Sequence, residues 1–314
     1  RDQPRSRGLG DVYKRQIERL VISLYAKGMS VSDIESEMQE IYGINLSTSA
    51  ISIITNKVSQ AASEWQNRPL ESLYMIVWMD GIVFKVRENG KVINKTVYLC
   101  VGLNKDGLKE VLGMWVGKNE SAAFWMGVLT DLKARGVENI LVTVTDNLNG
   151  FTETIKSVFP SSTTQICVVH QIRNSCRYVV WKEKKEFTSD LKNIYNAPTK
   201  EAAKMELDNF EQKWGSKYPY AIRSWRNNWE ELTVFFDFPV EIRKIIYTTN
   251  LIENLNGKIR KYTKNKLSFP NDDALKKSVY LAITEIEKKW YQPIWNWALI
   301  FNQFITIFEN RIQV

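Results

Sequence analysis

Cysteine, histidine and long apolar runs are what this 314-residue sequence has least of. Its cysteines, Cys100, Cys167 and Cys176, are an odd number in a long chain, which excludes a disulfide-stapled secreted domain and favours a reducing cytoplasm. No stretch supplies the roughly 20 apolar residues that a membrane-spanning helix needs. The chain also lacks the basic and then apolar order of a signal peptide at its start. We therefore expect a soluble, cytoplasmic protein.

The charges that are present are unevenly balanced. The chain has 43 Lys and Arg against 35 Asp and Glu, a net charge of +8, which favours a polyanionic partner such as DNA. Its length, at roughly 150 residues per domain, predicts two or three folding units.

Residues 1–16, RDQPRSRGLGDVYKRQ, have no hydrophobic period and do not lead into the periodic sequence that begins at Ile17. They resemble a translated sequencing adaptor. We interpret them as a non-native segment outside the fold.

Residues 17–66 predict three short helices, with Gly28 and Gly43 as stops and Ser30 and Ser47 as N-caps. A unit of this size is typical of a helix-turn-helix-like DNA-binding domain, whose recognition helix would be STSAISIITNKV. A helical bundle that serves only packing or dimerisation is the alternative.

The hydrophobic period then changes, and residues 72–170 alternate between strands and helices. Three strands joined by hairpin turns at Asn89-Gly90 and Asp106-Gly107 precede a helix, a strand, a helix and a last strand. This order is typical of a mixed α/β, ribonuclease H-like fold. The ranges that we expect are 74–86, 92–103 and 110–116 for the strands, 121–135 for a helix, 139–145 for a strand, 151–159 for a helix and 164–169 for a strand.

Helical patterns dominate the remainder of the chain. Residues 171–247 predict an all-helical insertion, and residues 248–314 predict helices that complete the same catalytic domain, broken by Pro270 and Pro293. Within the insertion, Trp214, Trp225 and Trp229 are best explained by core packing, with stacking on an unpaired base as the alternative.

Two aspartates lie where carboxylates are costly unless they bind a cation. Asp80 interrupts the apolar strand MIVWMDGIVF, and Asp146 ends the strand NILVTVTD. On such a sheet the first strand neighbours the fourth, so that the two side chains would converge. The alternative for Asp146 is an N-cap of the following segment.

Glu253, in the helical segment TTNLIENLNGKIRKYTKNK, is the candidate for a third ligand. Helical spacing places Asn256 on the same face. Three carboxylates suit Mg²⁺ or Mn²⁺, and two such ions can stabilise both oxygens of an in-line phosphoryl displacement. We therefore expect Asp80, Asp146 and Glu253 to be catalytic and metal-binding.

Basic and polar residues near these carboxylates are the candidates for DNA contact. The segment CVVHQIRN contains a Cys167/His170 motif, whose use as a zinc site is weak because no second Cys/His pair exists. A basic cluster follows Glu253, which places positive charge beside the metals. The expected DNA-binding residues are His170, Arg173, Asn250, Lys258, Arg260, Lys261 and Lys264, with Lys266 in the same cluster.

With these residues in view, the sequence resembles the Mutator-like insertion-sequence transposases of bacteria, a branch of the acidic-triad (DDE) superfamily. The resemblance runs from about Ile17 to the C-terminus through SLYAKGMSVSDI, WQNRPLE, LGMWVGKNESAAFW, TDNLNGF, CVVHQIRNS, FPVEIRKIIYTTNLIENLN and KWYQPIWNW.

The resemblance implies a ribonuclease H-like domain, interrupted by a helical insertion between the second Asp and the Glu, and a Cys-x-x-His signature at Cys167 and His170. It implies a metal-dependent DNA transposase that acts on the terminal inverted repeats of its own element and on target DNA. Such a protein would work in the bacterial cytoplasm, on the nucleoid, as a homodimer or higher homo-oligomer. Asn147, where family members usually have Gly, and a short N-terminus depart from the pattern.

A catalytically silent DNA-binding relative is one alternative, and a nuclease with this fold that lacks strand transfer is another. The intact Asp80, Asp146 and Glu253 favour the active enzyme.

Overall fold

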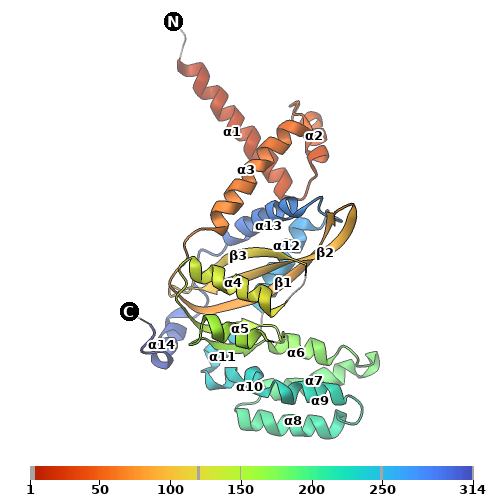
Figure 1. The fold of residues 1–314 in the computed structure, drawn as a ribbon, viewed down its shortest axis with the longest axis vertical. Helices are drawn as coiled ribbons and strands as arrows, with labels where there is room; N and C mark the ends of the chain where they lie inside the picture. The colour runs from red at the N-terminus through yellow and green to blue at the C-terminus, as the bar shows by residue number, and fades with distance from the viewer. Residues whose placement is uncertain (1–3, 119–120, 149, 248–249, 313–314) are drawn as a thin grey trace.

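The computed structural model describes residues 4–118, 121–148, 150–247 and 250–312, and only the backbone of residues 4–9 (Figure 1). The N-terminal helices lie at one end of the elongated chain, a mixed sheet in the middle, and a group of short helices at the other end. Within the described residues, no helix is both long and apolar enough to span a membrane.

One sheet organises the middle of the molecule, with strands in the order β3-β2-β1-β4-β5. The first three strands are antiparallel neighbours, while β4 and β5 run parallel to β1. At the first hairpin, Asn89 and Gly90 have φ angles of 50° and 76°, as the turn prediction requires. The bounds are β1 (Leu73–Glu88), β2 (Lys91–Leu103), β3 (Lys109–Gly117), β4 (Asn139–Thr145) and β5 (Thr163–Ile166).

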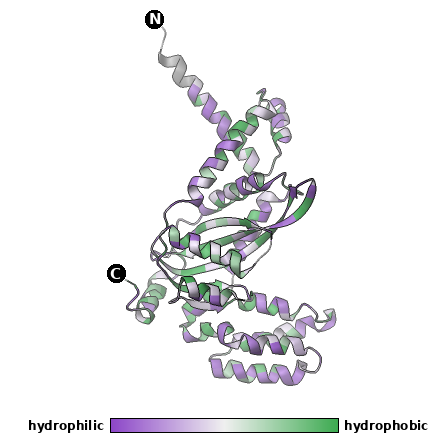
Figure 2. Cartoon of the chain, viewed as in Figure 1, coloured by the Kyte–Doolittle hydropathy of each residue, from purple (hydrophilic) through white to green (hydrophobic). Residues whose placement is uncertain are grey.

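Helices cover both faces of this sheet, so the domain has three layers. The helices α4 (Ala122–Ala134) and α5 (Phe151–Val158) pack on one face, where Val77 and Met79 are buried. The opposite face buries Trp78 and contacts α12 (Asn250–Thr263) and α13 (Asp272–Glu287). Alternate residues of β1 point to opposite faces, which explains why its first half, residues 73–79, is apolar throughout. The strands are largely green and white in the middle of the sheet in Figure 2, whereas purple residues lie on the outer helices and at the projecting end of the β1–β2 hairpin.

The N-terminal unit has the predicted three helices, α1 (Pro4–Ala26), α2 (Val31–Glu40) and α3 (Thr48–Gln66). The hydroxyls of Ser30 and Ser47 accept hydrogen bonds from backbone N–H groups three residues later, at 3.1 and 3.2 Å, so both predicted N-caps are confirmed.

Two features of this unit differ from the sequence interpretation. The first helix begins at Pro4 rather than near Ile17, although residues 10–16 are all exposed and packing starts at Ile17. The hydrophobic cluster of the three helices also includes Leu281 of α13, so the N-terminal unit is joined to the sheet domain through that helix.

The prediction of a strand to residue 169 is wrong, because β5 ends at Ile166 and a helix begins at Val168. Backbone N–H groups of Cys167 and Val168 donate to Thr145 and Tyr247, at 2.8 and 3.0 Å, which turns the chain out of the sheet where a strand was predicted. The insertion contains α6 (Val168–Ser175), η1 (Trp181–Glu183), α7 (Lys184–Tyr195), α8 (Lys200–Trp214), α9 (Pro219–Asn227), α10 (Trp229–Leu232), η2 (Val234–Asp237) and α11 (Val240–Ile246).

Tryptophan packing holds the insertion together, as expected. Trp214 and Trp225 are buried, and Trp229 packs against the same core from a partly buried position. The chain ends with α14 (Trp297–Ile307), after the break at Pro293.

Candidate active site

The two aspartates lie side by side because of the register between β1 and β4. Trp78 pairs with Val144 in the parallel ladder, and two further residues along each strand reach Asp80 and Asp146. Asp80 is only 8% exposed. Oxygen atoms of the two carboxylates and a ring nitrogen of His170 all lie within 4.8 Å of one another. Asp146 does not cap the next helix, because Gly150 occupies the N-cap position of α5.

Asp80 is held by two hydrogen bonds. Its Oδ1 accepts from the Gly81 backbone N–H at 2.8 Å, and its Oδ2 accepts from the side-chain amide of Asn256 at 2.7 Å. Asn256 belongs to α12 and is itself buried. Its position three residues after Glu253 was visible in the sequence, but its contact with Asp80 was not predicted.

The surroundings of Asp80 and Asp146 disfavour the ionisation of both carboxyl groups at once. Burial, and next the charge of Asp146, raise the pKa of Asp80 to about 7. Each of these effects penalises the ionised form of a carboxylate. A cation bound between the two aspartates would remove this penalty.

His170 stands beside Asp146, with its Nδ1 at 2.7 Å from Oδ1 of that aspartate. Burial alone would lower the pKa of His170, but hydrogen bonds to Asp146 and Cys167 outweigh burial and raise it. Cys167 is a buried cysteine in the thiol form at the start of α6. The motif therefore orients a histidine toward the aspartates. Among the described residues, the group of potential metal ligands consists of Asp80, Asp146 and His170.

Glu253 lies next to this group rather than within it. Its two carboxylate oxygens accept a forked pair of hydrogen bonds from Arg173, both at 2.8 Å, and its Oε1 lies 3.8 Å from Nε2 of His170. Arg173 was expected to contact DNA, and its partner in this structure is the third carboxylate. The charge of Glu253 also contributes to the raised pKa of Asp80, so the three acids share one electrostatic environment.

The donor set suits a hard divalent ion such as Mg²⁺ or Mn²⁺. Carboxylate oxygens converge from Asp80 and Asp146, and the carboxylate of Glu253 lies beside His170 at the edge of this group. Among the described residues, Oδ1 of the buried Asn256, whose side-chain nitrogen donates to Asp80, has no hydrogen-bond partner. Unsatisfied buried oxygen beside acidic ligands is consistent with a bound cation or its water shell.

The basic residues expected beside the carboxylates divide into two groups. Lys258, Arg260, Lys261 and Lys264 are exposed on or just after α12, and Asn250 is exposed at its start. Lys266 is instead turned inward, with its ammonium 4.1 Å from the centre of the Tyr25 ring. Burial and the neighbouring Lys277 lower the pKa of Lys266 to about 8. Lys266 is therefore part of the junction with the N-terminal helices and not of the exposed basic cluster.

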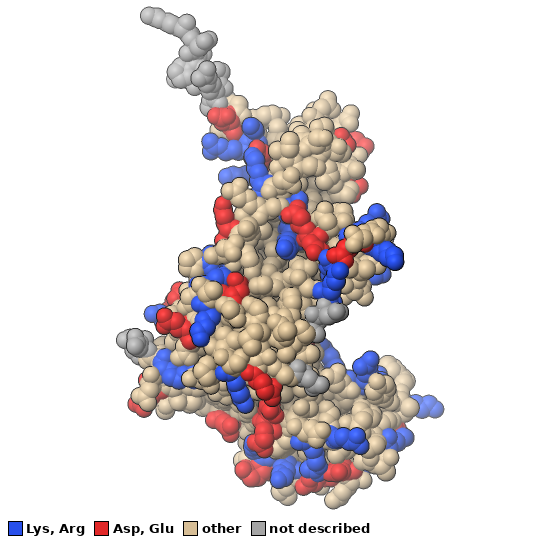
Figure 3. All heavy atoms as spheres, viewed as in Figure 1, with Lys and Arg blue, Asp and Glu red and all other residues tan. Residues whose placement is uncertain are grey.

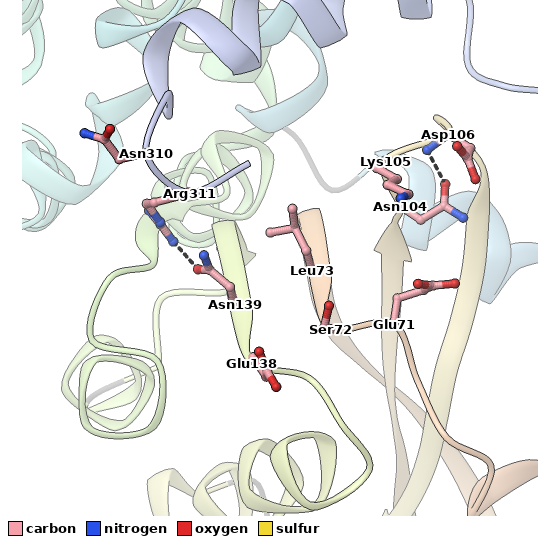
Figure 4. Close-up of a pocket in the computed structure, with 10 residues that line it drawn as sticks. All are labelled: Glu71, Ser72, Leu73, Asn104, Lys105, Asp106, Glu138, Asn139, Asn310 and Arg311. Atoms are coloured by element: carbon pink, nitrogen blue, oxygen red, sulfur yellow. Dashed lines mark hydrogen bonds between the residues drawn. The ribbon is translucent and has the colours of Figure 1, made fainter. Parts of the chain in front are cut away.

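A polar hollow lies at the starts of β1 and β4, at the opposite end of these strands from Asp80 and Asp146 (Figure 4). Glu71, Asp106 and Glu138 line it, together with Arg311, which donates to the side chain of Asn139. None of the expected site residues lines this hollow. Its acidic lining does not favour phosphate.

Comparison with known proteins agrees with the resemblance seen in the motifs. The family model described as "Transposase, Mutator family" matches residues 11–293. A probable transposase for an ISRM3-like insertion sequence element of Sinorhizobium fredii is 43% identical over 93% of this chain and 73% of its own length. A probable insertion-sequence transposase of Corynebacterium diphtheriae is 39% identical over 87% and 80%. The solved "Drosophila P element transposase strand transfer complex" is far more distant, with 12% identity and a TM-score of 0.28 over 83% of this chain and 79% of that one.

Proposed function

Because this chain belongs to the Mutator family of transposases, we propose that it cleaves DNA at the terminal inverted repeats of its own element and joins the ends to target DNA. The reaction would be a metal-assisted phosphoryl transfer with Asp80, Asp146 and Glu253 as the catalytic metal ligands. The observation that carries this proposal is the convergence of Asp80 and Asp146 from neighbouring parallel strands.

The architecture supports the same proposal. We interpret the mixed sheet, with its three antiparallel strands followed by two parallel ones, as a ribonuclease H-like domain into which the helical insertion is placed before α12. We interpret α1 to α3 as a helix-turn-helix-like unit with α3 as recognition helix.

The residues around the carboxylates have separable roles. Two divalent ions, when bound, would supply stabilisation of the attacking and leaving oxygens of the displacement. Asn256 fixes the orientation of Asp80, and His170 fixes that of Asp146. Arg173 pairs with Glu253 in this structure, and with Glu253 bound to a metal ion the guanidinium of Arg173 would be available for a DNA phosphate.

DNA approaches this site along the exposed face of α12 in our proposal. Lys258, Arg260, Lys261 and Lys264 would bind backbone phosphates, with Asn250 and His170 nearer to the scissile bond. On the face shown in Figure 3, the outline of the molecule is indented between the sheet domain and the insertion. Two protomers would be required to hold both ends of one element, which leads us to propose a homodimer or larger assembly.

Metal binding should depend on pH through Asp80. The raised pKa means that the folded protein holds a proton on Asp80 more tightly than the unfolded chain does, so without metal its stability falls as pH rises from about 4 to about 7. Mg²⁺ competes with this proton, and the ionised fraction of a group with a pKa of about 7 falls about ten-fold between pH 8 and pH 6. We expect the Mg²⁺ affinity to fall by about the same factor.

Isothermal titration calorimetry and thermal unfolding with Mg²⁺ at both pH values measure this effect. In Asp80→Asn the pH dependence should disappear together with most of the affinity. Equal Mg²⁺ stabilisation of the wild type at pH 6 and pH 8 would argue against Asp80 as a ligand.

A strand-transfer assay tests the proposed function against its alternatives. Duplexes that carry the DNA ends flanking the gene are incubated with protein, Mg²⁺ and a supercoiled target plasmid, and the joints are sequenced. A transposase gives joints between the element's end and the target, a nuclease gives cuts without joints, and a catalytically silent relative gives neither. The convergent carboxylates favour the first result.

A further inference from the structure

An exposed aromatic loop follows the helix that carries His170 and Arg173. Residues 177–183 connect α6 to α7, and here Tyr178, Val180 and Trp181 are 66%, 53% and 86% exposed. Large apolar side chains so open to solvent are uncommon and mark binding surfaces when they gather in one place. Within the described part of the chain, the Trp181 indole has no hydrogen bond and no ring partner.

This exposure is built into a fixed loop rather than arising from a loose one. Val179 is buried, and the backbone N–H of Val180 donates to the Tyr218 hydroxyl at 3.3 Å. The same hydroxyl donates to Glu183, which also forms an ion pair with Lys217. The loop is therefore anchored on both sides of Trp181 while the indole stays in solvent.

Cations surround the exposed rings. The guanidinium of Arg177 lies 5.6 Å from the centre of the Tyr178 ring, and Lys182, Lys184 and Lys185 follow within the next turn. Glu183, the acid in this stretch, is already neutralised by Lys217. Among the described residues, these four cations form no ion pair, so the loop presents unbalanced positive charge. Lys and Arg side chains are visible on the side of the insertion where α6 leads into α7 (Figures 1 and 3).

The loop is close enough to the carboxylates to meet the same DNA. From His170 the chain continues as helix to Ser175 and then through six residues to Trp181. At about 1.5 Å per helical residue and at most about 3.6 Å per extended one, Trp181 lies within about 30 Å of His170. That distance is less than one turn of B-form DNA, about 34 Å.

We propose that Tyr178 and Trp181 form a stacking site for unpaired bases of the DNA end, with Arg177, Lys182, Lys184 and Lys185 binding the adjoining phosphates. Exposed rings interleaved with cations are the chemistry that binds single-stranded DNA without sequence preference. Trp214 and Trp225, which a stacking role could also have involved, are buried in the insertion core. The inference rests on the proposed function, because it takes the element's DNA as the ligand.

Binding to two DNAs tests the stacking site. The full chain is titrated, with fluorescence anisotropy as readout, into one blunt duplex and into the same duplex with a short tail of unpaired thymidines. We expect the wild type to bind the tailed DNA about five-fold to about one hundred-fold more tightly, since stacking on an aromatic side chain has that effect per base. Trp181→Ala should lose this preference and keep its affinity for the blunt duplex, whereas Trp181→Phe, which retains a ring, should keep most of it.

Trp295 supplies a matched control, because it is 87% exposed and lies near α14, away from the aromatic loop. Trp295→Ala should behave as wild type. Iodouridine in the unpaired tail should crosslink to residues 177–183 under ultraviolet light. The inference is overturned if Trp181→Ala retains the tail preference, or if it loses self-association instead, which would assign the loop to a second copy of the chain. Failure to bind either DNA would overturn the proposed function itself.

Discussion

Replacing Asp146 with Asn is expected to abolish DNA cleavage and strand transfer while leaving DNA binding in place. The substitution keeps the size of the side chain but removes the charge that would hold a divalent ion next to Asp80. Metal stabilisation of a phosphoryl transition state is worth several kcal/mol, so a loss of about a thousand-fold or more in rate should follow. In the proposed function, phosphate contacts from the exposed basic residues would supply most of the affinity for DNA, and the substitution would not alter them.

Asp80→Asn should give the same loss of activity together with an informative change in stability. Burial raises the pKa of Asp80, so the ionised carboxylate destabilises the metal-free protein at neutral pH. Removing that charge should raise the melting temperature without metal. Rates are measured on labelled end DNA, binding by mobility shift and stability by calorimetry. Near-normal joining by either variant would contradict the assignment of the two aspartates.

The second large effect concerns which glutamate completes the site. Glu253→Gln should lose Mg²⁺-dependent cleavage, by about a hundred-fold or more if one ligand contact accounts for about 3 kcal/mol. Glu230→Gln and Glu241→Gln should retain most of the wild-type rate. Cleavage of end DNA at several Mg²⁺ concentrations provides the comparison, because a lost ligand also shifts the concentration needed for half-maximal rate.

The two control glutamates have partners in the structure that account for their positions without a metal ion. Glu230 is an exposed residue of α10 and pairs with Lys200 at 2.7 Å. Glu241 lies in the first turn of α11 and accepts a hydrogen bond from Gln303 at 2.8 Å. Normal cleavage by Glu253→Gln, combined with a defect in either control, would show that the third ligand has been wrongly assigned.

Much of the sheet and the aspartate pair could be predicted because short-range patterns determine them. Alternation and turn residues gave β1 to β4 within two residues at each end, and the register of parallel strands then places Asp80 beside Asp146. The prediction extended β5 three residues too far, to residue 169 instead of Ile166. Its apolar residues continue into α6, and the turn there is set by the hydrogen bond from Val168 to Tyr247, about eighty positions away.

Contacts between elements far apart in the chain could not be predicted from a single sequence. The pairs Arg173–Glu253 and Asn256–Asp80 each join elements more than seventy residues apart, and nothing in the local pattern indicates which of several charged partners will meet. Lys266 shows the same limit: in the sequence it continues a basic stripe, yet the fold turns it onto Tyr25. The exposure of Trp181 could not be predicted either. Hydrophobic periodicity indicates which side chains are buried far better than which aromatic side chains remain in solvent.

The position of bound Mn²⁺ is the most direct test of the proposed metal site. A complex of the protein with its end DNA is crystallised with Mn²⁺, and the anomalous difference map locates the ions. We expect ions between the carboxylates of Asp80 and Asp146, one of them also bound by Glu253 in place of Arg173. A map in which Mn²⁺ binds elsewhere, or in which Glu253 still pairs with Arg173 beside occupied metal sites, would contradict it.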